Sequence, residues 1–132
     1  MKKTLATAAL MIFLLPLGSD TQARDNLRQT QQGIASYYHD SLHGLKTASG
    51  QRYNKNRLSA AHKTLPLGTR IKVTDTRTGR SIIVKVNDRG PFVKGRILDL
   101  SREAAKELGI IKKGVAKVEL KVLNAPPAGR DS

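Results

Sequence analysis

Acid–base chemistry in this chain must rely on few carboxylates, because Lys and Arg outnumber Asp and Glu by 24 to 10 in the 132 residues. Most of the acidic residues have a plain structural interpretation, in a turn, a loop, a helix, the polar face of a strand or a terminal segment. Asp88, in KVNDRGPF, and Asp99, in RILDLS, remain, and each ends a strand-like run. Such a position is common for a site residue on a barrel rim. The neighbouring Asn87 and Gly90-Pro91 also fit Asp88 as a turn former, so the local residues leave both interpretations open.

Cleavage of a glycosidic bond is the chemistry that these acids could perform. It needs a proton for the leaving oxygen, and hydrolysis usually needs a second carboxylate. Aromatic side chains suited to stacking on sugar rings lie in or beside the same loops: Tyr37, Tyr38, Tyr53 and Phe92. Filling of the core explains these aromatic residues almost as well.

The three histidines do not predict a metal site. His39 and His43 are four residues apart, but they lie in a Ser/Gly/Asp-rich segment, and no cysteine or third histidine is placed to complete a ligand set. His62 follows Ala60-Ala61 and precedes a turn that contains Pro66. It could orient a carboxylate or bind a sugar hydroxyl, and a hydrogen-bonded structural histidine is the alternative. We expect neither a metal nor any other cofactor.

Short strands must position these residues. Alternating apolar residues predict strands at 69–74 and 115–122, and a run at 81–86 pairs with the first across the turn at 75–79. Residues 34–38 form another β-prone run. One short helix is expected, with Ser101 as its N-cap, Glu103 in its first turn and Gly109 at its end. Many short strands, frequent glycine and one small helix indicate a mainly β protein, a compact β-barrel.

The chain divides into four segments. Lys2-Lys3 and the apolar run 5–17, broken at Pro16 and Gly18, predict a signal peptide (1–23) cleaved after Ala23, and its shortness argues against a membrane anchor. A polar lead-in (24–32) and a Pro- and Gly-containing tail (124–132) are expected to be flexible. The barrel domain occupies 33–123, and the product is expected in the periplasm or outside the cell.

A strong positive charge accompanies the absence of cysteine. The formal net charge is +14, and removal of the signal with Lys2, Lys3 and Asp20 leaves 22 basic and 9 acidic residues, a net charge of +13. No disulfide can form, so packing alone must hold the domain. The charge favours anionic wall polymers, acidic lipid headgroups or muropeptide carboxylates as partners. No recognised fold motif or aromatic-rich surface supports nucleic acid.

Four motifs in combination, TASG, AAHKTLPLGT, VNDRGPF and RILDLS, closely resemble the barrel domain of the rare lipoprotein A (RlpA) family. With the last strand, the resemblance covers Gly33 to about Leu123. It implies a six-stranded double-psi β-barrel with one or two short helices. It also implies an endolytic peptidoglycan transglycosylase, often acting on glycan strands without stem peptides, that cuts between MurNAc and GlcNAc and leaves 1,6-anhydro ends. This reaction uses no water and can run on one principal carboxylate.

The resemblance also assigns site residues. It makes Asp88 the acid and base, with His62 supporting it, and Asp99 a second candidate acid by its similarity to the groove aspartate of expansins and lytic transglycosylase A. Substrate contacts are expected from Gln51, Tyr38, Tyr53, Arg89 and Phe92, and Arg96 is expected, with Arg89, to hold the charge of the site. The family's Glu is replaced here by Gln51. That replacement favours the alternative function, an expansin-like module that binds peptidoglycan without cutting it.

Targeting is expected to differ from that of many RlpA proteins. These carry a lipid-bearing cysteine and a C-terminal SPOR domain, and the sequence contains neither, so we expect no lipid anchor. The expected partners are glycan strands and, through the barrel, cell-division or wall-remodelling proteins.

Overall fold

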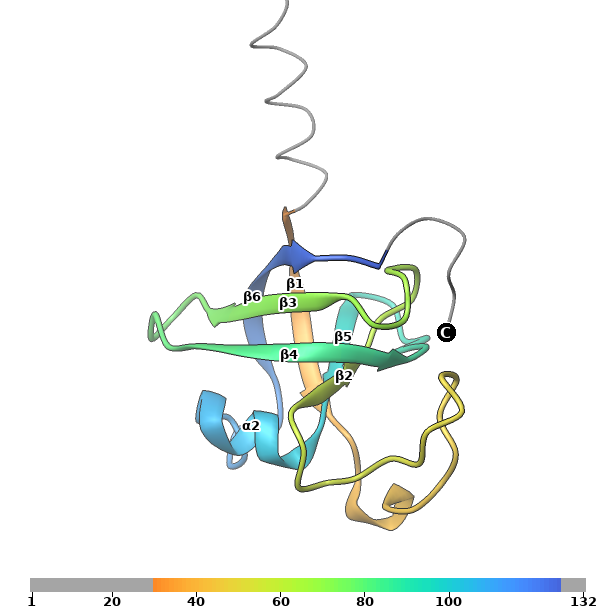
Figure 1. Ribbon diagram of the computed structural model, residues 1–132. Coiled ribbons are helices and arrows are strands. Elements are labelled where there is room, and N and C mark those ends of the chain that lie inside the picture. The colour runs from red at the N-terminus through yellow and green to blue at the C-terminus, as the bar shows by residue number, and fades with distance from the viewer. Residues whose placement is uncertain (1–29, 127–132) are drawn as a thin grey trace, which may run out of the picture.

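Six strands close into one barrel in the computed structural model, which describes residues 30–126 (Figure 1). They are β1 (Thr30–Tyr37), β2 (Ser59–Ala61), β3 (Arg70–Asp75), β4 (Ser81–Asp88), β5 (Arg96–Leu100) and β6 (Ala116–Asn124). Their order around the barrel is β1-β5-β2-β4-β3-β6, and β6 pairs with β1 to complete the circle. The β1–β5 and β2–β4 pairs are parallel and the others antiparallel. The mainly β, six-stranded barrel is therefore confirmed.

The barrel interior is filled by the apolar face of each strand. Ile71 and Val73 of β3 and Val118 and Leu120 of β6 are at most 1% exposed, as their alternation predicts. Side chains of this kind each contribute roughly 1.5–3 kcal/mol to stability when buried fully. The neighbouring side chains Lys72, Lys117 and Lys121 point to the outer face and are exposed.

Helix α2 (Arg102–Leu108) packs on one end of the barrel, and both of its predicted caps are present (Figure 1). The Ser101 hydroxyl accepts a hydrogen bond from the backbone N–H of Ala104, and Gly109 closes the helix with a φ of 85°. Only glycine takes that left-handed conformation without strain. Leu108 is buried in the core, so the caps fix the helix where its apolar side can pack.

The first strand begins earlier than expected. Residues 30–32 belong to β1 rather than to a flexible lead-in, because their backbones pair with Lys121, Leu120 and Glu119 of β6. Three polar residues carry no strand pattern, so their pairing with β6 could not be predicted from residue type. The final strand extends to Asn124, one residue beyond the expected domain end. The predicted signal peptide (1–23), residues 24–29 of the lead-in and residues 127–132 of the tail lie outside the described residues.

A long connection of residues 38–58 joins β1 to β2 and passes beside the lower part of the barrel (Figure 1). It contains the short 3-10 helix η2 (Asp40–Leu42) and an isolated bridge between Lys46 and Arg52. Within residues 30–126, no helix has the length and apolar character to cross a membrane.

Candidate functional site

The two candidate acids lie on either side of β2. Ala61 of β2 is in register with Asp88 of β4 on one side and with Asp99 of β5 on the other. Neighbouring strands are about 4.8 Å apart, which places the two aspartate Cα atoms roughly 10 Å from each other. Asp99 lies between the core residues Leu98 and Leu100, so its side chain points outward from the barrel. The barrel thus brings together two carboxylates that the sequence separates by eleven residues.

The Asp88 carboxyl group accepts hydrogen bonds from three separate segments. Its Oδ1 accepts from the backbone N–H of Ala48, at 2.8 Å, and from that of Arg89, at 2.9 Å. Its Oδ2 accepts from the phenol of Tyr38. These donors fix both oxygens in place and leave the group half-buried at the end of β4. Charge that develops on such an oxygen is stabilised without rearrangement.

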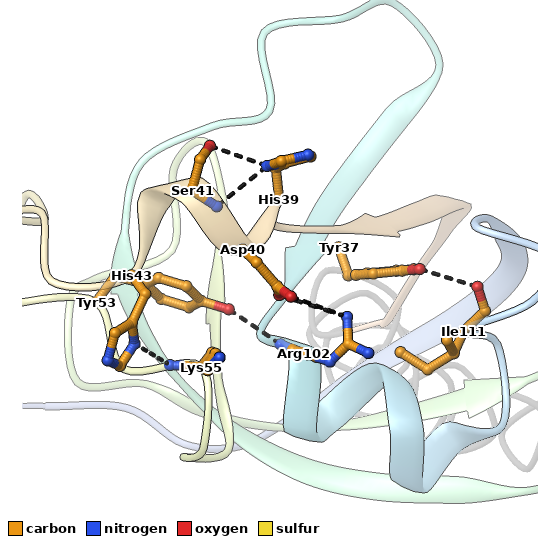
Figure 2. A network of polar contacts seen from close by, with 9 residues as sticks. All are labelled: Tyr37, His39, Asp40, Ser41, His43, Tyr53, Lys55, Arg102 and Ile111. Carbon is orange, nitrogen blue, oxygen red and sulfur yellow. Dashed lines mark hydrogen bonds and ion pairs between the residues drawn. The ribbon is translucent and has the colours of Figure 1, made fainter.

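Tyr38 is oriented by a second tyrosine. Its ring stacks on that of Tyr53, with centroids 4.5 Å apart, and the Tyr53 hydroxyl accepts from the backbone N–H of Arg102 at 3.0 Å (Figure 2). Burial and the hydrogen bond to Asp88 raise the pKa of Tyr38 well above its usual range, and burial likewise raises the pKa of Tyr53. The Tyr38 phenol therefore stays protonated and donates to Asp88.

The structure gives Tyr53 a second role beside the expected substrate contact. Its side chain is only 3% exposed, and Tyr38 stacks on its ring. One face of this ring is therefore covered by Tyr38, which Tyr53 orients, and contact of Tyr53 with substrate stays a prediction. The sequence could not distinguish the two roles, because both require an aromatic residue near the site.

The segment that carries these tyrosines is tied down by local polar contacts (Figure 2). The Nδ1 of His39 accepts from the N–H of Ser41, and the Nδ1 of His43 accepts from the N–H of Lys55. Asp40 forms an exposed ion pair with Arg102 at 3.3 Å, a contact of small energy. His39 and His43 thus hold the backbone of the loop, and among residues 30–126 no three His, Asp or Glu side chains gather as metal ligands would.

Asp99 is engaged in an ion pair. It accepts from Arg96 at 2.8 Å and from the Ser36 hydroxyl at 2.5 Å, and Arg96 also donates to Ser36 at 2.5 Å. Ser36 and Asp99 are register partners on β1 and β5. The Asp99 carboxylate is thus engaged by a guanidinium, whereas Asp88 forms no ion pair among the described residues.

Neither ring nitrogen of His62 is hydrogen-bonded to the Asp88 carboxyl group. Its Nδ1 accepts from the N–H groups of Thr64 and Leu65, so the proton lies on Nε2, which donates to Gln31 at 3.0 Å. Burial and the nearby Arg89 and Lys63 charges lower its pKa and keep the ring neutral. His62 meets Asp88 only through its backbone N–H, which donates to the Asp88 carbonyl at 3.1 Å.

The other expected substrate residues divide into buried and open positions. Arg89 is half-buried and donates to the carbonyls of His62, at 3.3 Å, and Leu65, at 2.7 Å, so it holds the turn after β2. Phe92 is 81% exposed directly after the cis Gly90–Pro91 bond and is free to stack on a ligand. Phe92 therefore fits substrate contact, whereas Nη1 of Arg89 is used within the protein and its contact with substrate stays a prediction.

Gln51 lines a cavity of about 510 Å³ beside Asp88. The lining includes Arg52, Tyr53, Arg57, Lys85 and Asn87. The loop joins β4 through the N–H of Ser49, which donates to the Asn87 carbonyl at 3.1 Å, and through the Ala48 contact described above. Gln51 is exposed and lies three residues after Ala48, whose N–H donates to the Asp88 carboxyl group.

Sequence reasoning missed two contributors. Ala48, in the TASG motif, acts through its backbone N–H, which no side-chain pattern can reveal. Ser36 could have been found, because it follows Ala35, a core residue, and must face outward from the same strand.

Comparison with known proteins identifies the family. The model of the lytic transglycolase family matches residues 30–120. Among curated relatives, the chain is 55% identical over 102 residues to the endolytic peptidoglycan transglycosylase RlpA of Pasteurella multocida, covering 77% of this chain and 35% of that protein. It is 52% identical over 95 residues to the protein of the same name from Campylobacter jejuni, covering 72% of this chain and 34% of the other. The chain thus spans about a third of the length of these relatives.

Solved structures share the barrel. A Streptomyces papain inhibitor matches with a TM-score of 0.60 and 25% identity, over 73% of this chain and 96% of that one. An expansin of Clavibacter michiganensis matches with a TM-score of 0.58 and 23% identity, over 75% of this chain and 52% of that one, a likeness of fold alone. The barrel is of the double-psi type, and the chain belongs to the lytic transglycolase family.

Proposed function

We propose that the protein is an endolytic peptidoglycan lytic transglycosylase that cuts the MurNAc–GlcNAc bond and leaves 1,6-anhydro-MurNAc ends. The observation that supports this most directly is the Asp88 carboxyl group, half-buried at the strand end and held on both oxygens by Ala48, Arg89 and Tyr38. The relatives named RlpA are transglycosylases by name.

Asp88 can serve both proton transfers in turn. As acid it gives its proton to the glycosidic oxygen of the leaving GlcNAc while the bond to C1 of MurNAc breaks. The C6 hydroxyl oxygen of the same MurNAc then bonds to C1, and its proton returns to Asp88. No water is consumed, and Asp88 ends the cycle protonated as it began.

The surrounding groups support the first step in particular. When Asp88 loses its proton, the Tyr38 phenol and the two backbone N–H groups stabilise the new carboxylate. Arg96 neutralises Asp99 and keeps it from competing as a second negative charge. Phe92 offers an exposed ring on which a sugar can stack.

A binding module of the expansin kind, without catalysis, is the second candidate. Gln51 favours it, because this exposed residue stands where active RlpA proteins are expected to carry a Glu. Glutamine has the shape of Glu but cannot exchange a proton near neutral pH. The single-carboxylate mechanism does not require that Glu, so the enzyme remains the better-supported proposal.

The deciding experiment incubates the purified protein with glycan strands stripped of stem peptides and with intact sacculi, and analyses the soluble products for anhydro ends. Release by the wild type and none by Asp88→Asn supports the enzyme, whereas co-sedimentation without products supports the binder. Gln51→Glu tests the replacement: if it releases no more product than the wild type, the missing Glu does not limit the protein.

We also propose that the protein acts in the periplasm or outside the cell, on the strength of the predicted signal peptide. Amino-terminal sequencing of the protein from its native host is expected to begin at Arg24. Recovery of the uncleaved chain from the cytoplasmic fraction contradicts this location.

A further inference from the structure

The cavity beside Gln51 has cationic walls. Arg52, Arg57 and Lys85 line it, and no Asp or Glu is among the described residues around it. Within residues 30–126, Arg57 and Lys85 lie in no ion pair with a carboxylate, while the guanidinium of Arg52 donates to the Gly44 carbonyl at 2.9 Å. Arg57 and Lys85 therefore have their charges available to a ligand.

The strand register places a further cation beside Lys85. Lys85 of β4 stands directly opposite Arg70 of β3, and both are exposed on the outer face of the barrel. Like charges in directly opposed positions of an antiparallel pair are destabilising. Within residues 30–126 neither cation forms an ion pair with a carboxylate, which fits a surface that a bound anion neutralises.

The cavity lies next to Asp88, because the preceding residue, Asn87, is part of its lining. Ser59 and Ala61 of β2 flank Ala60, which belongs to the core, so both face outward. Ser59 lines the cavity and is in register with Lys85, whereas Ala61 is in register with Asp88 and Asp99. Two residues along a strand correspond to about 7 Å. A chain-like ligand lying over Asp88 therefore reaches the cationic cavity with its next sugars.

We propose that this cavity is a carboxylate subsite, in which Arg57 and Lys85 bind the free lactyl carboxylate of a muramoyl residue that neighbours the bond to be cut. The inference rests on the proposed function, since it assumes a peptidoglycan glycan as ligand. The lactyl carboxylate is anionic where the stem peptide is absent and becomes a neutral amide where the peptide is attached. The subsite therefore selects peptide-free stretches of glycan by charge, at a place distinct from Asp88.

The test is a binding measurement on intact ligand. Asp88→Asn protein, which leaves the strand uncut, is titrated calorimetrically with peptide-free glycan oligomers and with the same oligomers whose carboxyl groups have been amidated. We expect the amidated ligand to bind about tenfold more weakly. When Arg57→Gln and Lys85→Gln are added together to the Asp88→Asn protein, the affinity for the native ligand should fall by the same factor. The native and the amidated ligand should then bind with equal affinity.

The matched control carries Arg77→Gln and Lys112→Gln, two exposed cations that do not line the cavity, and loses the same net charge. Its affinity should stay within about twofold of that of the Asp88→Asn protein. An equal loss in the control, or equal binding of the amidated ligand, overturns the subsite. So does equal competition by a single-stranded oligonucleotide of the same charge, because the cavity would then attract any polyanion.

Failure of the subsite and failure of the proposed function give different results. If protein with Asp88 intact releases anhydro ends equally from native and amidated glycan, the enzyme stands and the subsite falls. If no ligand yields anhydro ends while the carboxylate-dependent binding persists, the subsite stands and the catalytic proposal falls.

Discussion

At the scale of single residues, the site is organised around hydrogen-bond donors to Asp88. Tyr38 is one of these donors, and its ring is held by Tyr53, whose hydroxyl in turn accepts from the first turn of α2. The chain of contacts passes from the helix through two aromatic rings to one carboxyl oxygen. The orientation of Asp88 thus depends on residues that need not touch the substrate.

Tyr38→Phe should lower kcat about 10-fold to 100-fold with little change in KM, because the lost hydrogen bond stabilises the carboxylate formed when Asp88 gives up its proton. Initial rates of anhydro-end release measure this effect. Tyr37→Phe is the matched control, because the Tyr37 hydroxyl donates to the Ile111 carbonyl rather than to Asp88. Equal rates in the two variants would show that the Tyr38 phenol is not part of the acid's environment.

His62 should make stability depend on pH. Its pKa in the folded protein is lowered by burial and by Arg89 and Lys63, so the unfolded chain takes up the proton more readily. The stability due to neutral His62 is therefore complete above about pH 6.5 and is lost as the pH falls through the lower folded pKa. Urea unfolding at about pH 7.5 and about pH 5 should show a smaller loss of free energy in His62→Gln than in the wild type.

His39→Gln serves as the control for this pH dependence. His39 is exposed, and this substitution should leave the wild-type difference between the two pH values unchanged. If the free energy of unfolding falls as much between the two pH values in His62→Gln as in the wild type, groups other than His62 take up the protons.

Residue roles were only partly predictable from the sequence. The positions of Asp88, Asp99 and Phe92 follow from strand ends and turns, and the structure places the two aspartates beside one strand residue. The directions of the His62 and Arg89 side chains could not be predicted, because their partners are the Gln31 amide and backbone groups of the turn that follows β2. A hydrogen bond to a backbone group cannot be inferred from the type of the residue that supplies the group.

At the scale of elements, α2 links the barrel to the loop over the site. The buried Ser101 hydroxyl accepts from the N–H of Ala104 and donates to the Arg57 carbonyl at 2.5 Å. It therefore caps the helix and holds the chain just before β2. One hydroxyl joins an element of the core to a wall of the proposed subsite.

Ser101→Ala should lower the free energy of unfolding by about 2–3 kcal/mol, because it removes the helix cap and leaves the part-buried Arg57 carbonyl without its donor. Urea denaturation with an unchanged m-value measures the effect. Ser81→Ala, at an exposed position on β4, is the control and should shift the free energy by no more than about 0.5 kcal/mol. A loss below that size for Ser101→Ala would contradict the double role of this hydroxyl.

Elements with a regular apolar period were predictable, and elements ordered by partners were not. The alternation in β3 and β6 and the caps of α2 agree with the structure because each records a local requirement for burial or capping. Residues 30–32 and the 38–58 connection lack such a period, and contacts with distant strands determine their conformation.

At the scale of the whole molecule, closure of the barrel depends on β6. This strand pairs antiparallel with both β1 and β3, so it joins the two ends of the sheet. Alternation within one strand indicates which side is buried but not which strands are neighbours. The barrel topology was therefore predictable only through the resemblance to a known family.

A chain that ends at Gly114 should not fold. Loss of β6 removes the pairing partner of two strands and the buried side chains of Val118 and Leu120, and it opens both edges of the sheet. Circular dichroism and amide dispersion in NMR spectra should show an unfolded chain. A chain that ends at Pro126 retains all six strands and should give the spectra of the intact barrel; a folded spectrum for the shorter chain would show that the five-stranded sheet is self-sufficient.

Pairing of β1 with β6 has a consequence for how this domain can be joined to others. Thr30, at the start of the barrel, stands opposite Lys121, so the polypeptide enters and leaves the fold on adjacent strands and at the same end. A short linker from Asn124 to Thr30 is therefore sufficient to circularise the domain, and new termini can be opened in the exposed turn between β3 and β4. The same geometry allows the barrel to be inserted at a single position of a larger polypeptide without pulling the host's chain apart.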